Sequence, residues 1–139
     1  MVLHPGSART EKFWLAERWA EVANHLQASG LPVVLTGGTS RMEKDHLARI
    51  KALVTNPVID LSGKLNLLAV AALIQRARLL ATVDSAPMHL AGALGTPQII
   101  LSGPPILSTG IPGDRRRSFC RPARRIRAEI SCRSKRAIR

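Results

Sequence analysis

Six consecutive residues combine a carboxylate, a hydroxyl and an imidazole where an apolar run meets a small-residue segment. In "DSAPMH" these groups belong to Asp84, Ser85 and His89. Ser85 is a good N-cap residue, and Pro87 suits the first turn of a helix because its missing N–H costs nothing there. The N–H groups at such a helix start attract anions. The stretch therefore suits a phosphate site, in which His89 donates to a phosphate oxygen and Asp84 holds a ribose hydroxyl, orients a loop or binds a cation carried by the phosphates.

Two further clusters carry groups that can bind other parts of a nucleotide. The segment "HPGSARTEK" offers a Gly-Ser turn, the hydroxyl of Ser7 and the mobile positive charge of Lys12, a set that can hold a diphosphate. The segment "TGGTS" has glycines for a close backbone approach, although it lacks the Gly-x-Gly-x-x-Gly spacing of a dinucleotide site. Glu43 follows it, and its carboxylate either faces solvent or holds a ribose. Solvated loop side chains are the alternative for both clusters.

These clusters share a place in the elements that the hydrophobic pattern predicts. Strands are expected at 2–4, 31–38, 58–63, 78–84 and 97–103, and helices at 14–28, 40–53, 66–76 and 86–94. Such alternation indicates an α/β fold, a doubly wound, Rossmann-like parallel sheet that is covered on both faces. Ligands bind these sheets outside the carboxyl ends of the strands. Because each cluster follows a strand, we favour binding over a structural cap with a packed histidine, and we expect one shared cleft for Ser7, Lys12, Asp84, Ser85 and His89.

The positive charge of the chain is concentrated at its C-terminal end. The formal net charge is +12, of which residues 105–139 contribute +9 and residues 1–104 contribute +3. A nucleic-acid-binding protein that acts through this Arg-rich tail is the alternative function, but it predicts interleaved aromatic residues or a basic helix face. The tail holds one aromatic residue, Phe119, and its arginines follow no helical face. We therefore expect no specific nucleic-acid partner.

Several other chemistries and locations lack their sequence patterns. Cys120 and Cys132 have no zinc-ligand spacing with a histidine, and neither a Gly-x-Ser-x-Gly elbow nor a Walker loop occurs. No apolar run approaches the about 20 residues of a membrane-spanning helix. The first residues, "MVLHPGS", do not have the pattern of a signal peptide. A cytoplasmic protein is expected.

Three segments together resemble the lipopolysaccharide heptosyltransferases, which form glycosyltransferase family nine. They read "HPGSARTEKFWLAERWAEVANHL", "VVLTGG" and "DLSGKLNLLAVAALIQRARLLATVDSAPMHLAGALGTPQIILSGP". The likeness covers roughly residues 2–104, and the Asp-Ser-x-Pro-x-His segment followed by Leu-Gly-Thr-Pro is highly specific. It implies the C-terminal, donor-binding half of a two-domain GT-B fold, with residues 1–104 as a nucleotide-sugar-binding domain. The implied activity is transfer of heptose from ADP-heptose to the lipopolysaccharide core.

The resemblance also implies roles for single residues. Ser7 and Lys12 match positions that contact the donor diphosphate; Asp84, Ser85 and His89 match the phosphate- and sugar-side motif; Glu43 lies near the position that holds the ribose. The proposed catalytic base of the family belongs to the N-terminal domain, which we expect to be absent here, so this chain is expected to be inactive alone. No cofactor is firmly implied, and Mg²⁺ bound with the donor diphosphate is left open. Because the implied acceptor is a lipid, the protein is expected in the cytoplasm or peripherally on the inner face of the inner membrane.

The likeness ends near residue 105. The family usually continues Gly-Pro-Thr-Asp-Pro-Phe-His-Trp, whereas this chain reads "GPPILSTGIP". Restoring one base in a coding string for this stretch gives the family sequence. We therefore interpret residues 105–139 as a frameshifted or disordered basic tail, whose arginine excess comes from an out-of-frame, GC-rich sequence. A natural basic tail is the alternative.

Overall fold

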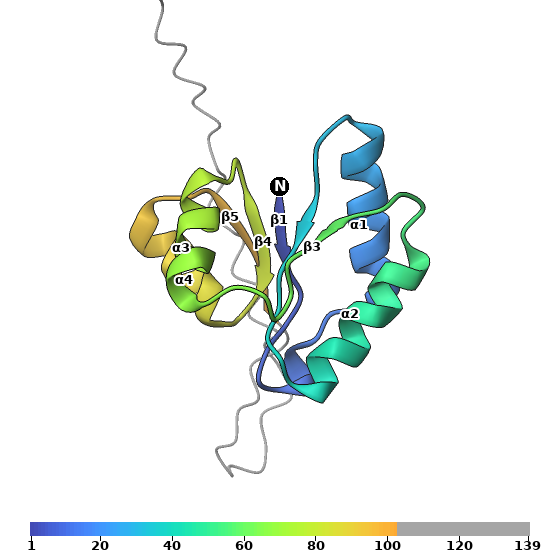
Figure 1. The fold of residues 1–139 in the computed structure, drawn as a ribbon, viewed down its shortest axis with the longest axis horizontal. Helices are drawn as coiled ribbons and strands as arrows, with labels where there is room; N and C mark the ends of the chain where they lie inside the picture. Colours follow the sequence, from blue (N-terminus) through green and yellow to red (C-terminus); the bar gives the residue numbers. More distant parts are fainter. Residues whose placement is uncertain (103–139) are drawn as a thin grey trace, which may run out of the picture. The chain divides into compact units, whose positions relative to one another are not determined.

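A five-stranded parallel sheet between two pairs of helices organises residues 1–102, the part of the chain that the computed structural model describes (Figure 1). The strands are β1 (Val2–His4), β2 (Val34–Leu35), β3 (Ile59–Asp60), β4 (Leu80–Val83) and β5 (Gln98–Leu101). The helices are α1 (Ala16–Ala28), α2 (Arg41–Leu53), α3 (Leu67–Arg76) and α4 (Ala86–Leu94), with a 3-10 helix η1 (Thr10–Lys12) after β1. Each strand and helix expected from the sequence is present, and η1 was not expected.

The strand order confirms the doubly wound sheet. The strands lie in the order β3-β2-β1-β4-β5, and every neighbouring pair is parallel. The chain therefore starts at the central strand β1, adds β2 and β3 on one side of it, and then crosses over to add β4 and β5 on the other side. The reversal leaves a crevice at the carboxyl ends of β1 and β4, which is where ligands bind in sheets of this kind.

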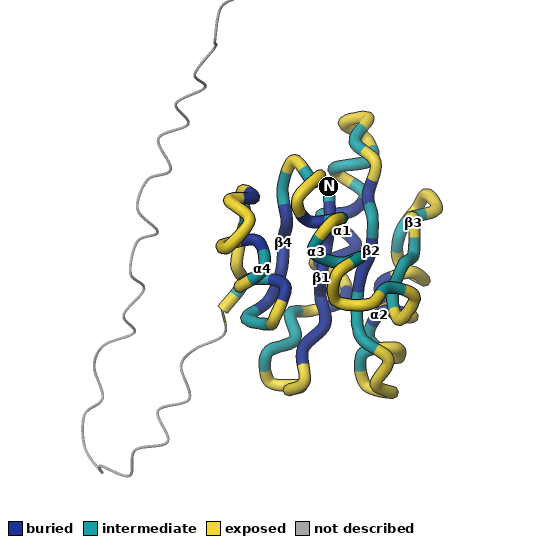
Figure 2. The backbone as a smooth tube through the Cα atoms, turned by 60° about the vertical axis from the view of Figure 1, so that its left-hand side comes forward, coloured by how far each residue is buried: buried dark blue, intermediate teal, exposed yellow. Residues whose placement is uncertain are grey.

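Alternating side chains of the central strands bury themselves on opposite faces of the sheet. In β1, Leu3 packs with Trp19 of α1 and Ile50 of α2, whereas Val2 packs with Ile74 of α3 and Ala91 of α4. Figure 1 shows these helix pairs on the two sides of the sheet, and Figure 2 shows that β1 and β4 are the most buried strands. The two apolar faces explain why these strands read as continuous hydrophobic runs.

Local signals place the helix ends. Ser40 caps α2 by accepting from the N–H of Glu43, and Asn66 caps α3 by accepting from the N–H of Ala69. Gly95 ends α4 in the left-handed region at φ 69°, a conformation that costs glycine little. Ser40 and Asn66 thus set where α2 and α3 begin, and Gly95 sets where α4 ends.

The predicted ranges were too long at every strand except β1, most of all at β2 and β3, and at the start of α1. The segments 31–38 and 58–63 contribute only β2 and β3, two residues each. Pro32 has no N–H to donate, and β3 pairs with a neighbour on one side only, so the ladder is short there. Helix α1 begins at Ala16, because Leu15, its N-cap residue, has a non-helical backbone with ψ 135°.

No helix within residues 1–102 is long and apolar enough to cross a membrane. The expectations for the basic tail, including its disorder, its frameshifted origin and the domain boundary at 104, fall outside the described residues. They stay predictions.

Candidate functional site

A cavity of about 470 Å³ opens at the carboxyl ends of β1, β2 and β4. Its size is typical of a small-molecule site. Loops after four strands and the starts of three helices form its walls. The lining residues are His4, Gly6, Ser7, Ala8, Arg9, Lys12, Gly37, Gly38, Glu43, Leu65, Leu67, Val70, Asp84, Ser85, Ala86, Pro87 and Leu90. The cavity therefore occupies the crevice that the strand order predicts.

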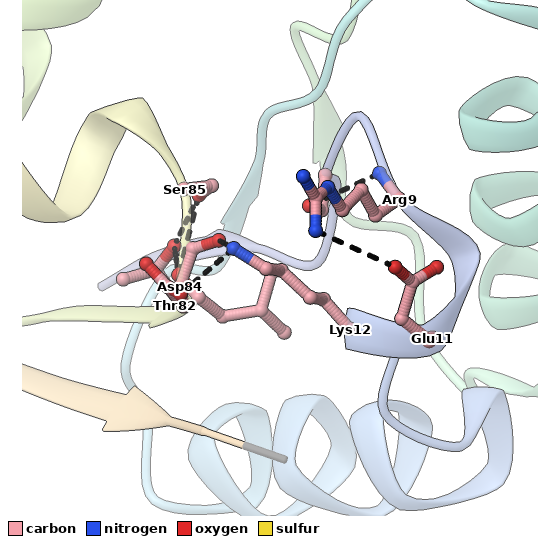
Figure 3. Close-up of polar contacts among 8 residues, drawn as sticks. Arg9, Glu11, Lys12, Thr82, Asp84 and Ser85 are labelled. Atoms are coloured by element: carbon pink, nitrogen blue, oxygen red, sulfur yellow. Dashed lines mark hydrogen bonds and ion pairs between the residues drawn. The ribbon is translucent and has the colours of Figure 1, made fainter. Parts of the chain in front are cut away.

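One ion pair crosses this crevice. Lys12 reaches from η1 to the end of β4, where its Nζ lies 2.7 Å from Oδ2 of Asp84 and 3.4 Å from the Asp84 carbonyl oxygen (Figure 3). The hydrogen bond from Lys12, together with its charge, lowers the pKa of Asp84. Asp84 is therefore a carboxylate at neutral pH and holds the ammonium group of Lys12 at the cavity wall.

Ser85 occupies the N-cap position of α4, as expected, but its side chain does not cap the helix. Its Oγ donates to the Val83 carbonyl oxygen at 3.2 Å and lies 3.2 Å from Oγ1 of Thr82 (Figure 3). Pro87 lies in the first turn and has no N–H. Because no side chain of the N-cap residue covers the start of α4, its positive end faces the cavity, where Ser85 and Ala86 line the wall.

The loop after β1 supplies two more polar groups. Ser7 is only 6% exposed, and its Oγ accepts from the backbone N–H of Arg9 at 3.3 Å. The guanidinium group of Arg9 lies 3.9 Å from Glu11, an exposed and therefore weak ion pair (Figure 3). Arg9 and Lys12 thus place two cationic side chains on one side of the cavity, beside the hydroxyl of Ser7.

Glu43 and His4 form the wall nearest to β2. One oxygen of Glu43, Oε1, accepts from the N–H of Gly38 at 3.2 Å, and Oε2 accepts from Oγ of Ser40 at 2.9 Å. Nδ1 of His4 lies 2.9 Å from Oγ1 of Thr36, whose hydroxyl donates to the Leu3 carbonyl oxygen. Nδ1 therefore carries the proton. Burial lowers the pKa of His4 to about 4, although the charge of Glu43 opposes the shift, so His4 is neutral at pH 7.

The opposite wall is apolar. Leu65, Leu67 and Val70 come from the start of α3 and the loop before it, and Leu90 comes from α4. Leu67 is 64% exposed and the adjacent Leu68 is 80% exposed. An apolar wall with a leucine as open to solvent as Leu67 suits a flat or apolar portion of a ligand.

Five of the six residues expected to bind a ligand line this one cavity: Ser7, Lys12, Glu43, Asp84 and Ser85. His89 does not line it; the side chain is exposed on α4, although its charge is close enough to contribute to the lowered pKa of Asp84. The binding roles of all six stay predictions. The polar residues after β3 do not line the cavity. The backbone N–H of Ser62 and Nζ of Lys64 both donate to oxygens of Asp60.

Sequence reasoning missed the apolar wall, His4 and Arg9. The segment "LNLLAVAALI" is apolar around the whole helix, which is a signal that one side of α3 has an unusual neighbour. His4 and Arg9 stand in the "HPGSARTEK" segment that was singled out, but nothing in the spacing says which side chains turn inward. The cavity as a whole offers cations and a helix start for an anion, carboxylates for hydroxyl groups, and an apolar wall for a ring.

Comparison with known proteins identifies the family of the chain. The sequence model of glycosyltransferase family 9 (heptosyltransferase) matches residues 1–115. Lipopolysaccharide heptosyltransferase 3 of Escherichia coli is 38% identical over 107 residues, which cover 74% of this chain and 31% of that protein.

Two solved structures have the same arrangement of elements. Escherichia coli ADP-heptose lipopolysaccharide heptosyltransferase II superposes with a TM-score of 0.68 at 30% identity, over 74% of this chain and 32% of that one. Escherichia coli heptosyltransferase WaaC with ADP-2-deoxy-2-fluoro heptose superposes with a TM-score of 0.59 at 28% identity, again over 74% and 32%. The chain spans about a third of the length of these relatives.

Proposed function

The chain belongs to glycosyltransferase family 9, the heptosyltransferases, and from this premise we propose that residues 1–102 bind the nucleotide-sugar donor of a heptose transfer. The donor is ADP-heptose and the acceptor of the intact enzyme is the lipopolysaccharide core. The observation that carries the proposal is the Lys12–Asp84 pair beside the start of α4, at the switch point of the sheet. A relative whose structure was solved with an ADP-heptose analogue supports the choice of donor.

The donor fits the cavity group by group. The diphosphate lies against Lys12, Ser7 and the N–H groups at the start of α4, because charge-assisted hydrogen bonds and the helix dipole both favour an anion there. Glu43 accepts hydrogen bonds from the ribose. The adenine ring of the donor lies against the apolar wall, where it removes exposed leucine surface from water. This wall consists of Leu65, Leu67, Val70 and Leu90. His89 lies outside the cavity lining, so its contact with the donor stays a prediction.

The described residues contribute electrostatics to the transfer. The acceptor hydroxyl attacks the anomeric carbon of the donor as the bond to the ADP oxygen breaks, and negative charge grows on the diphosphate. Lys12 and the N–H groups at the start of α4 stabilise that charge. One such hydrogen-bond donor typically lowers the activation free energy by about 3 kcal/mol. The base that removes the proton of the acceptor hydroxyl belongs to the part of the relatives that this chain does not span.

The proposal includes no step through a metal ion. Among residues 1–102, no three His, Cys, Asp or Glu side chains gather as metal ligands, and Asp84 is already paired with Lys12. The proposed location is the cytoplasm, at the inner face of the inner membrane, where such an acceptor is met. The alternative function, nucleic-acid binding through the tail, depends on residues outside the described part.

Isothermal titration calorimetry with ADP and ADP-heptose tests the donor site. We expect the 139-residue chain to bind both, and Lys12→Ala to weaken both at least tenfold, because it removes a charge-assisted contact worth about 1.5–3 kcal/mol. Lys44→Ala, which removes an exposed lysine of α2 outside the cavity lining, is the matched control and should bind as the unmodified chain does. Equal binding by all three proteins, or no binding at millimolar ligand, would reject the site.

A further inference from the structure

Gly6 and Gly38 face the Glu43 carboxylate from two loops. A Cβ atom added to Gly6 would overlap Oε1 of Glu43, and one added to Gly38 would overlap Oε2, both at separations that real Cβ atoms essentially never have. Gly6 belongs to the loop after β1 and Gly38 to the loop after β2. The carboxylate therefore lies in a seat between these loops that exists only because neither residue has a side chain.

Backbone conformation does not explain either glycine. Within residues 1–102, positive φ values occur only at Gly30, Gly63 and Gly95, so an alanine could adopt the backbone of Gly6 or Gly38. Gly37 is different again, because a Cβ atom there would lie 2.6 Å from Cδ1 of the buried Leu47. Gly37 thus makes room for the core, whereas Gly6 and Gly38 make room for one polar side chain.

The seat also fixes which lone pairs of Glu43 stay free. A carboxylate has about four lone-pair positions. The N–H of Gly38 occupies one on Oε1, and the hydroxyl of Ser40 occupies one on Oε2. One position on each oxygen is left, and Glu43 is one of the residues that line the cavity. Two acceptors about 2.2 Å apart, the usual spacing in a carboxylate, suit two adjacent hydroxyl groups.

We propose that Gly6 and Gly38 are positioning residues for donor recognition, which seat the Glu43 carboxylate so that it accepts from the two adjacent ribose hydroxyls of the donor. The identity of the ligand rests on the proposed function above; the seat itself rests on the geometry of residues 6, 38 and 43. Because the overlapping atoms are the far end of a flexible side chain, an alanine at either position displaces the carboxylate and leaves the fold intact.

The test compares ADP with 2′,3′-dideoxy-ADP, which lacks both hydroxyls, by calorimetry on the 139-residue chain. Gly6→Ala and Gly38→Ala should each weaken ADP binding roughly 10- to 100-fold, the usual range for losing hydrogen bonds to a charged group. Neither should change binding of the dideoxy analogue. Gly92→Ala is the matched control, because a Cβ atom there approaches only Gln98, at 3.7 Å, and it should bind both nucleotides normally. Equal losses for ADP and the analogue would mean a disturbed phosphate loop and would overturn the proposal.

A second background isolates the role of Glu43. In a chain that carries Glu43→Ala, adding Gly6→Ala should not weaken ADP binding further, since the group that the glycine positions is gone. An additive loss would also overturn the proposal. If the unmodified chain binds no nucleotide, the proposed function fails, and the seat is judged by the side-chain carboxyl ¹³C resonance of Glu43. Gly6→Ala must shift that resonance and Gly92→Ala must not.

Discussion

His4 is a neutral imidazole in a place that water hardly reaches, at the end of the central strand. Its Nδ1–H donates to Oγ1 of Thr36, and His4 is one of the residues that line the cavity. Burial lowers its pKa to about 4 from the ordinary 6.5. Between these values the unfolded chain binds a proton that the folded chain does not, so the stabilising contribution is fully present above pH 6.5 and is lost as the pH falls toward 4.

We expect this one residue to make the free energy of unfolding depend on pH. The difference between the two pKa values of His4 corresponds to a decrease of about 3 kcal/mol in the free energy of unfolding between pH 6.5 and pH 4. His4→Asn keeps a donor for Thr36 and should remove most of this loss, which urea unfolding at several pH values measures. His46, whose pKa burial also lowers, contributes equally in both proteins and cancels. The same pH slope in both proteins would show that His4 is not the titrating group.

At the scale of elements, α3 connects a helix cap to the apolar wall of the cavity. Oδ1 of Asn66 accepts from the Ala69 N–H at 2.9 Å, and the helix that starts there carries Leu67 and Val70. Asn66→Ala should therefore lower the free energy of unfolding by about 1 kcal/mol. Asn66→Asp keeps an acceptor and should stay close to the unmodified chain in the same denaturant titration. A loss of equal size in both variants would assign the effect to the loop rather than to the cap.

The elements were predictable because their signals are local. Apolar spacing located all four helices, and Ser40, Asn66 and Gly95 stand where caps were to be expected. The strand order was not predictable. An apolar run such as "LATV" indicates a buried strand, but it does not indicate which other strand pairs with it. The site was partly predictable for the same reason. Lys12 and Asp84 each follow a strand, but their contact spans 72 positions and needs β1 and β4 to be neighbours. The seat of Glu43 depends on three such segments at once.

At the scale of the whole molecule, the proposed function gives the chain the groups for one substrate of a two-substrate reaction. A polypeptide of these 139 residues should show no transfer of radiolabelled heptose to a lipopolysaccharide acceptor, because the family resemblance assigns the base to another domain. Its affinity for ADP should be weak, since water reaches the diphosphate in an open cavity and weakens each charged contact. Turnover well above a blank without protein would place the base among the residues present, with Asp84 as the first candidate.

The central position of β1 has a consequence for the order of synthesis. β1 hydrogen-bonds on one side to Leu80–Val83, which emerge from the ribosome much later than β1 does. At about 5–20 residues per second, that edge and the apolar face that awaits α3 and α4 stay open for several seconds. During this interval the nascent chain presents the unpaired strand edge and exposed hydrophobic surface that chaperones bind and that promote aggregation. The yield of folded protein should thus depend on β4 and β5, the last two strands of residues 1–102 to leave the ribosome.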